Sequence, residues 1–288
     1  MQLLKALFIL PCILSQRKET WKAAVYEHDL ITAVDVGCTE DVCTREEAVD
    51  MMEMNLEILR NNVELASQQG VDLILLPEDG IHGYGFNRKN IRPFLEEVPE
   101  IADGSNPCNS FEEMSNTYDF LMEHYVMIQL SCMARNNNLY VAACLGSIVK
   151  NCDRCDENHG RDCFYNTLVV FDPDGALVSV YHKYNLWTSE LPIYDIDPEP
   201  VLVTLDTPFG KLGMAICEDL LWYSPVVPMA EEQEIDTLLL PLSWWDMFPH
   251  QLGHSNEDAW ARGLQINLLA ANNHVPEVRF KQMIWFLI

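Results

Sequence analysis

Positive charge is scarce in this sequence. Only 18 of its 288 residues are Lys or Arg, against 44 Asp and Glu, so the formal net charge at pH 7 is −26. A protein that binds nucleic acid needs a basic face to neutralise phosphates, so this balance argues against DNA or RNA as a partner. It argues equally against electrostatic binding to an anionic membrane surface.

Long apolar runs are also scarce. The main one, residues 6–14 ("ALFILPCIL"), lies between Lys5 and Ser15 and is too short to span a bilayer. This layout is typical of a secretory signal peptide, so we expect residues 1–15 to be one, with an apolar N-terminal strand as the alternative. No other stretch is long enough for a transmembrane helix, since the closing "MIWFLI" has six residues.

Repeats, low-complexity runs and linkers are missing too, and there is no Asn-x-Ser/Thr sequon. Nothing therefore divides the chain into separate units. With 49% hydrophobic residues, 288 residues can build one sizeable core, which favours a single large domain.

Cysteine, in contrast, is plentiful, which fits export to an oxidising compartment. Of ten cysteines, Cys12 lies in the expected signal peptide; if one other is a reactive thiol, eight remain for up to four disulfides. The best disulfide candidates lie in polar loops: Cys38, Cys43, Cys152, Cys155 and Cys163. Cys132 and Cys144 have more apolar surroundings and are candidate buried thiols. Cys152-x-x-Cys155 could also suggest zinc, but no second pair with ligand spacing follows.

Predicted helices and strands alternate along the chain. A helix over 44–70 has a capping box at Thr44 and Glu47 and a glycine stop at Gly70. A second long helix is expected between residues 110 and 136, another over 257–264, and one starting at Ser224 as cap with Pro225 in its first turn. Strands are expected within 21–30, 71–79, 138–147, 165–185, 200–219, 235–245 and 266–274. The pattern predicts an α/β domain with a mixed sheet.

Three of these strands end in chemically complementary residues. Glu78, Lys183 and Cys217 each follow an apolar run, and sites in α/β proteins gather at the carboxyl ends of strands. A cysteine thiol is mostly protonated at neutral pH and needs a base and a positive neighbour to react. Taken singly, each residue could be structural; together they favour nucleophilic catalysis. A cysteine protease would need a Cys–His pair; His182 lies beside Lys183, but no Asn/His order in the sequence supports that alternative.

Four segments resemble the nitrilase (carbon–nitrogen hydrolase) superfamily, and within it the vanin and biotinidase branch. They are "LILLPEDGIHGYGFNR", "NTLVVFDPDGALVSVYHKYNLW", "GKLGMAICEDLLWYSPVV" and "LLLPLSWWDMFPH". The resemblance runs from Trp21 to Pro276. It implies a nitrilase-like α-β-β-α sandwich with mixed sheets over residues 21–276.

The resemblance also implies a Glu-Lys-Cys triad. Glu78 matches the general base, Lys183 the oxyanion-stabilising lysine and Cys217 the nucleophile. Glu190 matches a further acid near the lysine, and Asp219 an acid that supports the loop. Tyr84, Trp187 and Trp244 are candidate pocket aromatics, although core packing is the alternative for each.

The implied activity is hydrolysis of a linear carbon–nitrogen amide bond by a secreted enzyme through a cysteine thioester. The expected partner is a small amide, and similarity to this branch favours pantetheine, with biotin amides as the alternative substrate. A non-catalytic secreted relative is the alternative function. Neither a metal nor an organic cofactor is expected, and the sequence predicts no oligomeric state. An extracellular location is expected, with a membrane anchor in a further C-terminal part left open.

The end of the chain departs from the family pattern. Residues 277–288 form an atypical tail where the family continues into a further strand and a second β-rich domain. We therefore expect a truncated C-terminal end, with unpaired sheet edges at the strands within 235–242 and 266–273.

Overall fold

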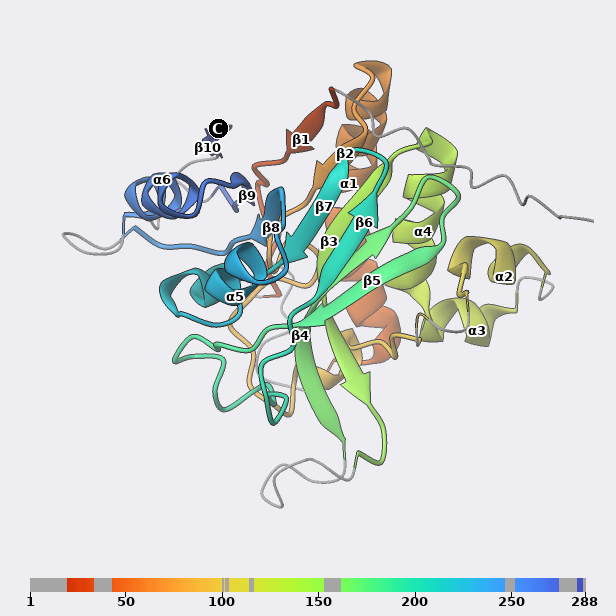
Figure 1. Ribbon diagram of the computed structural model, residues 1–288. Coiled ribbons are helices and arrows are strands. Elements are labelled where there is room, and N and C mark those ends of the chain that lie inside the picture. Colours follow the sequence, from red (N-terminus) through yellow and green to blue (C-terminus); the bar gives the residue numbers. More distant parts are fainter. Residues whose placement is uncertain are drawn as a thin grey trace, which may run out of the picture.

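The computed structural model describes residues 20–33, 43–99, 101, 104–113, 117–152, 162–246, 252–274 and 284–286. Two five-stranded mixed sheets form its centre (Figure 1). The expected signal peptide, residues 1–15, lies outside the described residues, as do Cys38 and Cys155.

Each sheet combines parallel and antiparallel pairs. The first has the order β1-β2-β3-β4-β5 and the second the order β10-β9-β8-β7-β6. The strands of the first sheet are β1 (Ala23–Val25), β2 (Leu73–Leu75), β3 (Tyr140–Val149), β4 (Cys163–Phe171) and β5 (Leu177–His182). Those of the second are β6 (Thr204–Thr207), β7 (Gly210–Met214), β8 (Thr237–Pro241), β9 (Asn267–Ala271) and β10 (Ile284–Phe286). β1–β2–β3 and β7–β8–β9 are the parallel sets.

Helices cover the outer face of each sheet. α1 (Arg45–Gln68) and α4 (Tyr125–Asn137) pack on the first sheet, with the short helices α2 (Pro107–Glu113) and α3 (Tyr118–Glu123) beside α4. α5 (Val226–Glu231) and α6 (Gly253–Leu264) pack on the second sheet. Figure 1 shows α5 and α6 on the opposite side from α4. The layers confirm the predicted α-β-β-α sandwich.

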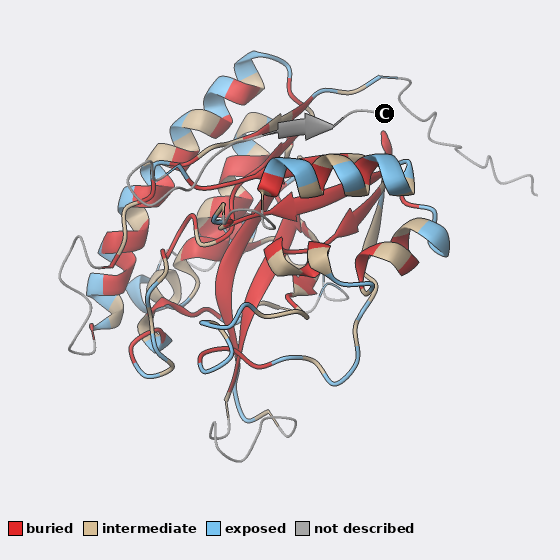
Figure 2. Cartoon of the chain, turned by 90° about the vertical axis from the view of Figure 1, so that its left-hand side faces the viewer, coloured by how far each residue is buried: buried red, intermediate tan, exposed pale blue. Residues whose placement is uncertain are grey.

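The core divides at the strands because side chains alternate between the two faces of a strand. In β2, Leu73 and Leu75 point between the two sheets, where they meet Leu212 and Leu268. Ile74 points the other way, into the cluster formed with α1 and α4. Figure 2 shows the strands almost wholly buried and the helices buried on one side only.

The predicted cap of the first long helix is confirmed. The Thr44 hydroxyl accepts a hydrogen bond from the Glu47 backbone N–H, and the Glu47 carboxylate accepts one from the Thr44 backbone N–H. Gly70 follows the helix with a φ of +71°, a conformation that glycine adopts without a steric penalty. The β4–β5 hairpin turns over Asp172–Gly175, where the Gly175 N–H donates to the Asp172 carbonyl.

The second long helix, expected somewhere between residues 110 and 136, is α4. It begins only after His124, where the chain leaves helical geometry with a φ of −124° and a ψ of 27°, and the short helices α2 and α3 precede it. The prediction for the Ser224–Pro225 pair was wrong in detail. Ser224 does not cap α5: Pro225 occupies the N-cap without a side-chain hydrogen bond. The Ser224 carbonyl instead accepts a hydrogen bond from the Asn185 side chain at 2.8 Å. A 3₁₀ helix over Cys217–Leu221 was not predicted.

The cysteines follow the sequence expectation only in part. Cys152 forms a disulfide with Cys163, which removes Cys152 as a zinc ligand, and Cys43 is also disulfide-bonded. Cys132 is not a buried thiol, because it pairs with Cys108 from α2; apolar surroundings alone do not exclude a partner. Cys144 is a free buried thiol as predicted, and Cys217 is free as well.

The expected unpaired edges are absent at the two strands concerned. β8 is an interior strand between β7 and β9. β9 has a second partner in β10, with Ile284 opposite Ala270 and Phe286 opposite Leu268. A three-residue strand from the tail therefore covers this side of β9. Among the described residues, no helix is both long and apolar enough to cross a bilayer.

We predict that Thr44→Ala destabilises the protein by about 1 kcal/mol, because it removes one half of the capping box of α1. Chemical denaturation should show a lower midpoint at an unchanged slope. Thr117→Ala is the matched control, since Thr117 is the N-cap of α3 but makes no capping hydrogen bond with its side chain in the described structure. Equal losses in the two variants would contradict the prediction.

Candidate active site

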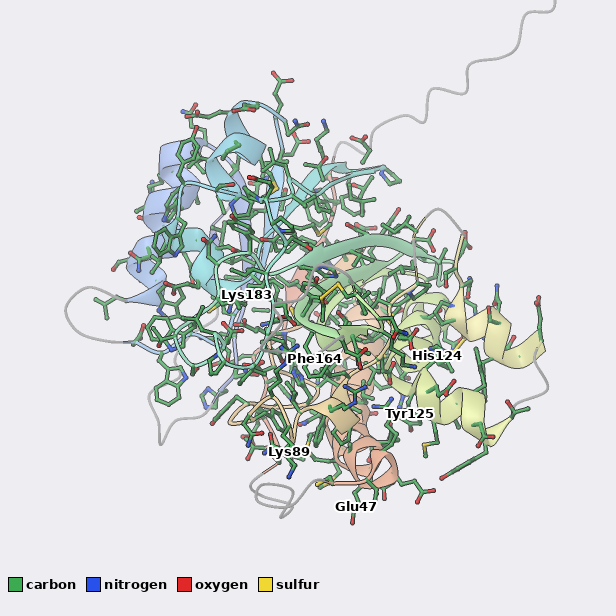
Figure 3. The ribbon with its side chains drawn as sticks, turned by 90° about the horizontal axis from the view of Figure 1, so that it is seen from below. Glu47, Lys89, His124, Tyr125, Phe164 and Lys183 are labelled. Carbon is green, nitrogen blue, oxygen red and sulfur yellow. A yellow bond between two sulfur atoms is a disulfide. The ribbon has the colours of Figure 1, made fainter. Side chains whose placement is uncertain are left out.

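The predicted triad residues come together at one end of the sandwich. Glu78 lies in the turn after β2, and Lys183 directly follows β5, so both come from the first sheet. Cys217 begins the 3₁₀ helix that follows β7 of the second sheet. The site therefore exists only because the two sheets stack with these strand ends together. Figure 3 shows Lys183 in the interior of the chain.

Lys183 is a buried cation with two carboxylate partners. Its side chain is about 1% exposed, and its Nζ donates to Glu78 Oε1 at 2.7 Å and to Glu190 Oε2 at 2.5 Å. A buried charge is tolerated only when it is paired and hydrogen-bonded. Burial lowers the pKa of Lys183, but the negative charges of Glu190 and Glu78 outweigh it and raise that pKa well above the ordinary value. The amine is therefore charged at neutral pH.

Glu78 is the centre of a hydrogen-bond network. Its Oε1 accepts from Lys183 and from the Asn166 side chain at 2.8 Å, and its Oε2 accepts from the Ser243 backbone N–H at 2.8 Å. The Asn273 side chain holds the Glu78 carbonyl at 2.8 Å. Burial raises the pKa of Glu78, and the charge of Lys183 only partly opposes it. A carboxylate with a raised pKa is a better proton acceptor.

Cys217 has an unusual backbone and lies close to the predicted base, Glu78. Its φ is +45°, in the left-handed region that residues other than glycine seldom adopt. Its thiol lies near enough to Glu78 and to the Ser243 backbone N–H for both to act on its pKa. Burial and the charge of Glu78 raise the pKa of the thiol well above its usual range, against the opposite effect of Lys183. The resting thiol is therefore protonated and needs a base to react.

Asp219 holds the turn that presents Cys217. It is fully buried, and its Oδ2 accepts from the Ile216 N–H at 2.9 Å and from the Tyr181 hydroxyl at 2.7 Å. Its Oδ1 accepts from the backbone and the side chain of Asn185 at 2.8 and 2.9 Å. These contacts fit the expected supporting role, and Asp219 does not line the pocket beside Cys217.

A pocket of about 490 Å³ opens onto Glu78, Lys183 and Cys217. The three aromatic residues expected from the sequence all line it: Trp244 is buried, whereas Trp187 is 36% exposed at its rim. Among the described residues, six aromatic side chains line it: Tyr84, Phe86, Trp187, Tyr194, Trp244 and Trp245. The pocket therefore offers apolar walls above a polar floor.

Two pocket loops are linked to each other by side chains of the "GIHGYGFNR" segment. Arg88 donates to the Ile193 carbonyl at 2.7 Å and to Asp195 Oδ2 at 2.8 Å. The His82 Nε2 and the Tyr194 hydroxyl lie 3.0 Å apart in a hydrogen bond. These contacts fix residues 193–195 against residues 82–88, and with them the width of the pocket.

Sequence reasoning missed Asn166, Ser243 and Asn273. Asn166 had a signal, since it is a polar residue inside β4, every residue of which is buried. Ser243 acts through its backbone N–H, so its residue type carries no signal. Among the described residues, no cluster of three or more His, Cys, Asp or Glu side chains could hold a metal ion.

Residues 49–276 match the family model for carbon–nitrogen hydrolases, which covers most of the chain. The chain belongs to the carbon–nitrogen hydrolase family. Mouse (Mus musculus) pantetheinase is 39% identical over 277 residues, covering 95% of this chain and 52% of the relative. Human (Homo sapiens) pantetheinase is 38% identical, with 90% and 48% covered. Takifugu rubripes biotinidase is 39% identical, with 88% and 49% covered.

These relatives confirm the vanin and biotinidase branch of the nitrilase superfamily, and the chain spans about half of their length. Solved structures agree on the fold. An amidase from Nesterenkonia sp. has a TM-score of 0.58 at 17% identity, covering 95% of this chain and 81% of its own. Nit3 of Saccharomyces cerevisiae, of nitrilase branch 10, has a TM-score of 0.62 at 16% identity, with 90% and 78% covered.

The buried His82 predicts a loss of stability in acid. Burial lowers its pKa from 6.5 to about 4, so it stays neutral in the folded protein while the unfolded chain takes up a proton. Its contribution to stability is therefore full above pH 6.5 and falls by about 3 kcal/mol on the way down to pH 4. Denaturation midpoints of the wild type and of His82→Gln across this pH range measure it.

The His82→Gln variant keeps a side chain that can hydrogen-bond Tyr194 but has no proton to take up at this position. Its stability should depend less steeply on pH between 6.5 and 4 than that of the wild type. If the stability of the two proteins depended on pH equally steeply in this range, His82 would not be the cause of the loss of stability in acid.

Proposed function

We propose that this chain hydrolyses a linear carbon–nitrogen amide bond through a thioester on Cys217. The observation that supports it best is that Cys217 shares the floor of an apolar pocket with the hydrogen-bonded pair of Glu78 and Lys183. A thiol, a base with a raised pKa and a fixed cation are the groups that acyl transfer requires. The other candidate, a non-catalytic secreted relative, has no need of this buried charge arrangement.

The first step is transfer of the Cys217 proton to Glu78. Glu78 Oε1 already accepts two hydrogen bonds, whereas Oε2 accepts one, from the Ser243 N–H. The proton therefore goes to Oε2. The thiolate then attacks the substrate carbonyl carbon, forming a carbon–sulfur bond and placing a negative charge on the carbonyl oxygen.

Lys183 is suited to stabilise that oxyanion. An ammonium has three N–H donors, and Glu78 and Glu190 take two of them. The third remains for the oxyanion, at a site where burial strengthens the interaction. The carbon–nitrogen bond then breaks as the nitrogen takes the proton from Glu78, and the amine leaves.

Water completes the cycle. Glu78 takes a proton from the water molecule, whose oxygen attacks the thioester carbonyl; the carbon–sulfur bond breaks and the acid leaves. The proton on Glu78 then passes to the Cys217 sulfur, which restores both the thiol and the carboxylate. This sequence uses side chains and water alone, so it calls for neither a metal nor an organic cofactor.

The charges of the pocket favour pantetheine as substrate, split into pantothenate and cysteamine. Lys183 is the sole cation among the described residues that line the pocket, and both Glu78 and Glu190 already bind it. No free positive group is left in that lining for a substrate carboxylate. Pantetheine is uncharged, whereas biocytin carries the carboxylate and ammonium groups of its lysine. Biotin amides are the second candidate because biotinidases are among the relatives.

The disulfides Cys108–Cys132 and Cys152–Cys163 support secretion as the location, because such bonds persist in oxidising compartments. The proposed enzyme therefore acts outside the cytosol on a small amide. It has no predicted nucleic-acid partner, and its net charge of −26 disfavours binding to anionic membranes.

Cys217→Ala should abolish release of cysteamine from pantetheine, because no thioester can form. Cys144→Ala is the matched control, since both cysteines are buried free thiols but only Cys217 lines the pocket. An electrophilic amide analogue should label the wild type at Cys217, as found by mass spectrometry. Turnover by Cys217→Ala at the wild-type rate would refute the proposal, and faster hydrolysis of biocytin than of pantetheine would favour the second candidate.

Lys183→Arg should lower kcat by about 10²-fold or more, the scale of losing an oxyanion donor. Arginine keeps the charge but presents a larger planar group that does not fit the space between Glu78 and Glu190. Steady-state kinetics with pantetheine measure the effect. A rise in KM at unchanged kcat would instead make Lys183 a substrate-binding residue.

A further inference from the structure

Asn166 makes contacts that the mechanism above does not yet use. Its side-chain Nδ2 donates to Glu78 Oε1 at 2.8 Å and to Glu190 Oε1 at 2.9 Å. Its backbone carbonyl accepts the Lys183 N–H at 2.9 Å. The side chain lies in β4 and is about 1% exposed. Asn166 therefore touches both carboxylates that bind the Lys183 ammonium, and it holds the backbone of Lys183 itself.

The orientation of this amide follows from its neighbours. Ionised carboxylates can only accept hydrogen bonds, so the NH₂ group and not the carbonyl must face Glu78 and Glu190. The Asn166 Oδ1 is left buried, with no hydrogen-bond partner in the described part of the chain. An unpaired buried polar atom is costly, and a cost of this kind calls for an explanation beyond packing.

Four side chains close a ring of hydrogen bonds: Glu78, Lys183, Glu190 and Asn166. Lys183 bridges the two carboxylates on one side, and Asn166 bridges them on the other. Glu78 Oε1 receives one hydrogen bond from each. Without Asn166, Oε1 would keep one donor, as Oε2 does, and the two oxygens would compete for the Cys217 proton.

We propose that Asn166 is a positioning residue for the reaction on Cys217. It occupies Glu78 Oε1, so that Oε2 takes the proton, and its N–H groups stabilise Glu78 and Glu190 as neighbouring anions. This inference rests on the proposed function. Asn166 does not line the pocket, so it acts through Glu78 and not on the substrate.

The charged and titratable groups around Glu78 determine how its pKa responds when the Asn166 side chain is removed. Lys183 favours the ionised form of Glu78, whereas Glu190 disfavours it; Asp79 and Cys217 also lie within interaction range. Hydrogen bonds donated to an anion lower its pKa. Loss of the Asn166 donor should therefore keep Glu78 protonated up to a higher pH. On the acidic side of the pH profile, activity should then begin at a higher pH.

The test compares Asn166→Ser, Asn166→Asp and, as a control, Asn267→Ser. Asn267 is a partly buried asparagine on β9 that does not line the pocket. Two profiles are measured from pH 4 to 9: kcat/KM for pantetheine, and the rate at which iodoacetamide alkylates Cys217. The second needs no amide turnover, so it tests Asn166 even if the proposed hydrolysis fails in the wild type. Thermal unfolding reports stability separately.

We expect Asn166→Ser to lower kcat/KM at acid pH by about tenfold or more, the scale of a hydrogen bond to a charged group, with KM little changed. Asn166→Asp should lose more, although it matches the shape of asparagine, because it adds a third negative charge. In both variants alkylation should begin at a higher pH than in the wild type and in Asn267→Ser.

A structural role predicts the opposite order, with the isosteric Asn166→Asp closer to the wild type. Unmoved pH profiles with a lower melting temperature would overturn the inference, as would equal shifts in Asn267→Ser. If Asn166→Ser does not fold, the pH profiles of kcat/KM and of alkylation in Asn166→Asp test the inference by the same criteria. A wild type that hydrolyses no amide, but whose Asn166 variants shift the alkylation profile, would refute the proposed function and keep this inference.

Discussion

The burial of one cation, Lys183, is the constraint on which the rest of the site depends. A charged amine at about 1% exposure is tolerated only with opposite charges in contact, and Glu78 and Glu190 provide them. Their two negative charges exceed its one, so the set needs a further neutral donor, which Asn166 supplies. The buried lysine thus requires the two carboxylates, and the two carboxylates require the asparagine.

The two-sheet architecture is what makes this arrangement possible. The first sheet contributes the lysine, both carboxylates and the asparagine, whereas the second contributes Cys217 and the Ser243 N–H. Neither sheet holds a complete site. The apolar core between the sheets therefore positions catalytic groups as well as stabilising the fold, and a shift of one sheet on the other would separate the thiol from its base.

The residue pattern predicts an α/β domain with strands that end in Glu78, Lys183 and Cys217, and the resemblance to the nitrilase superfamily implies the sandwich and the triad. It could not show the pairing of Cys132 with Cys108, because apolar surroundings suit a disulfide as well as a thiol. The role of Asn166 depends on the register that places β4 beside β5 and beneath Glu78, a relation that no local pattern encodes. Backbone donors such as the Ser243 N–H carry no residue signature at all.

Reactivity at this site depends on access and partners more than on acidity. Cys144 and Cys217 are both buried free thiols, and burial raises the pKa of each well above its usual range. Cys144 is fully buried in the core, whereas Cys217 lines the pocket together with Glu78. A thiol that stays protonated until its base acts is protected from unspecific reaction. The left-handed turn that Asp219 holds gives Cys217 its place at the pocket, next to Glu78, the base proposed to make it reactive.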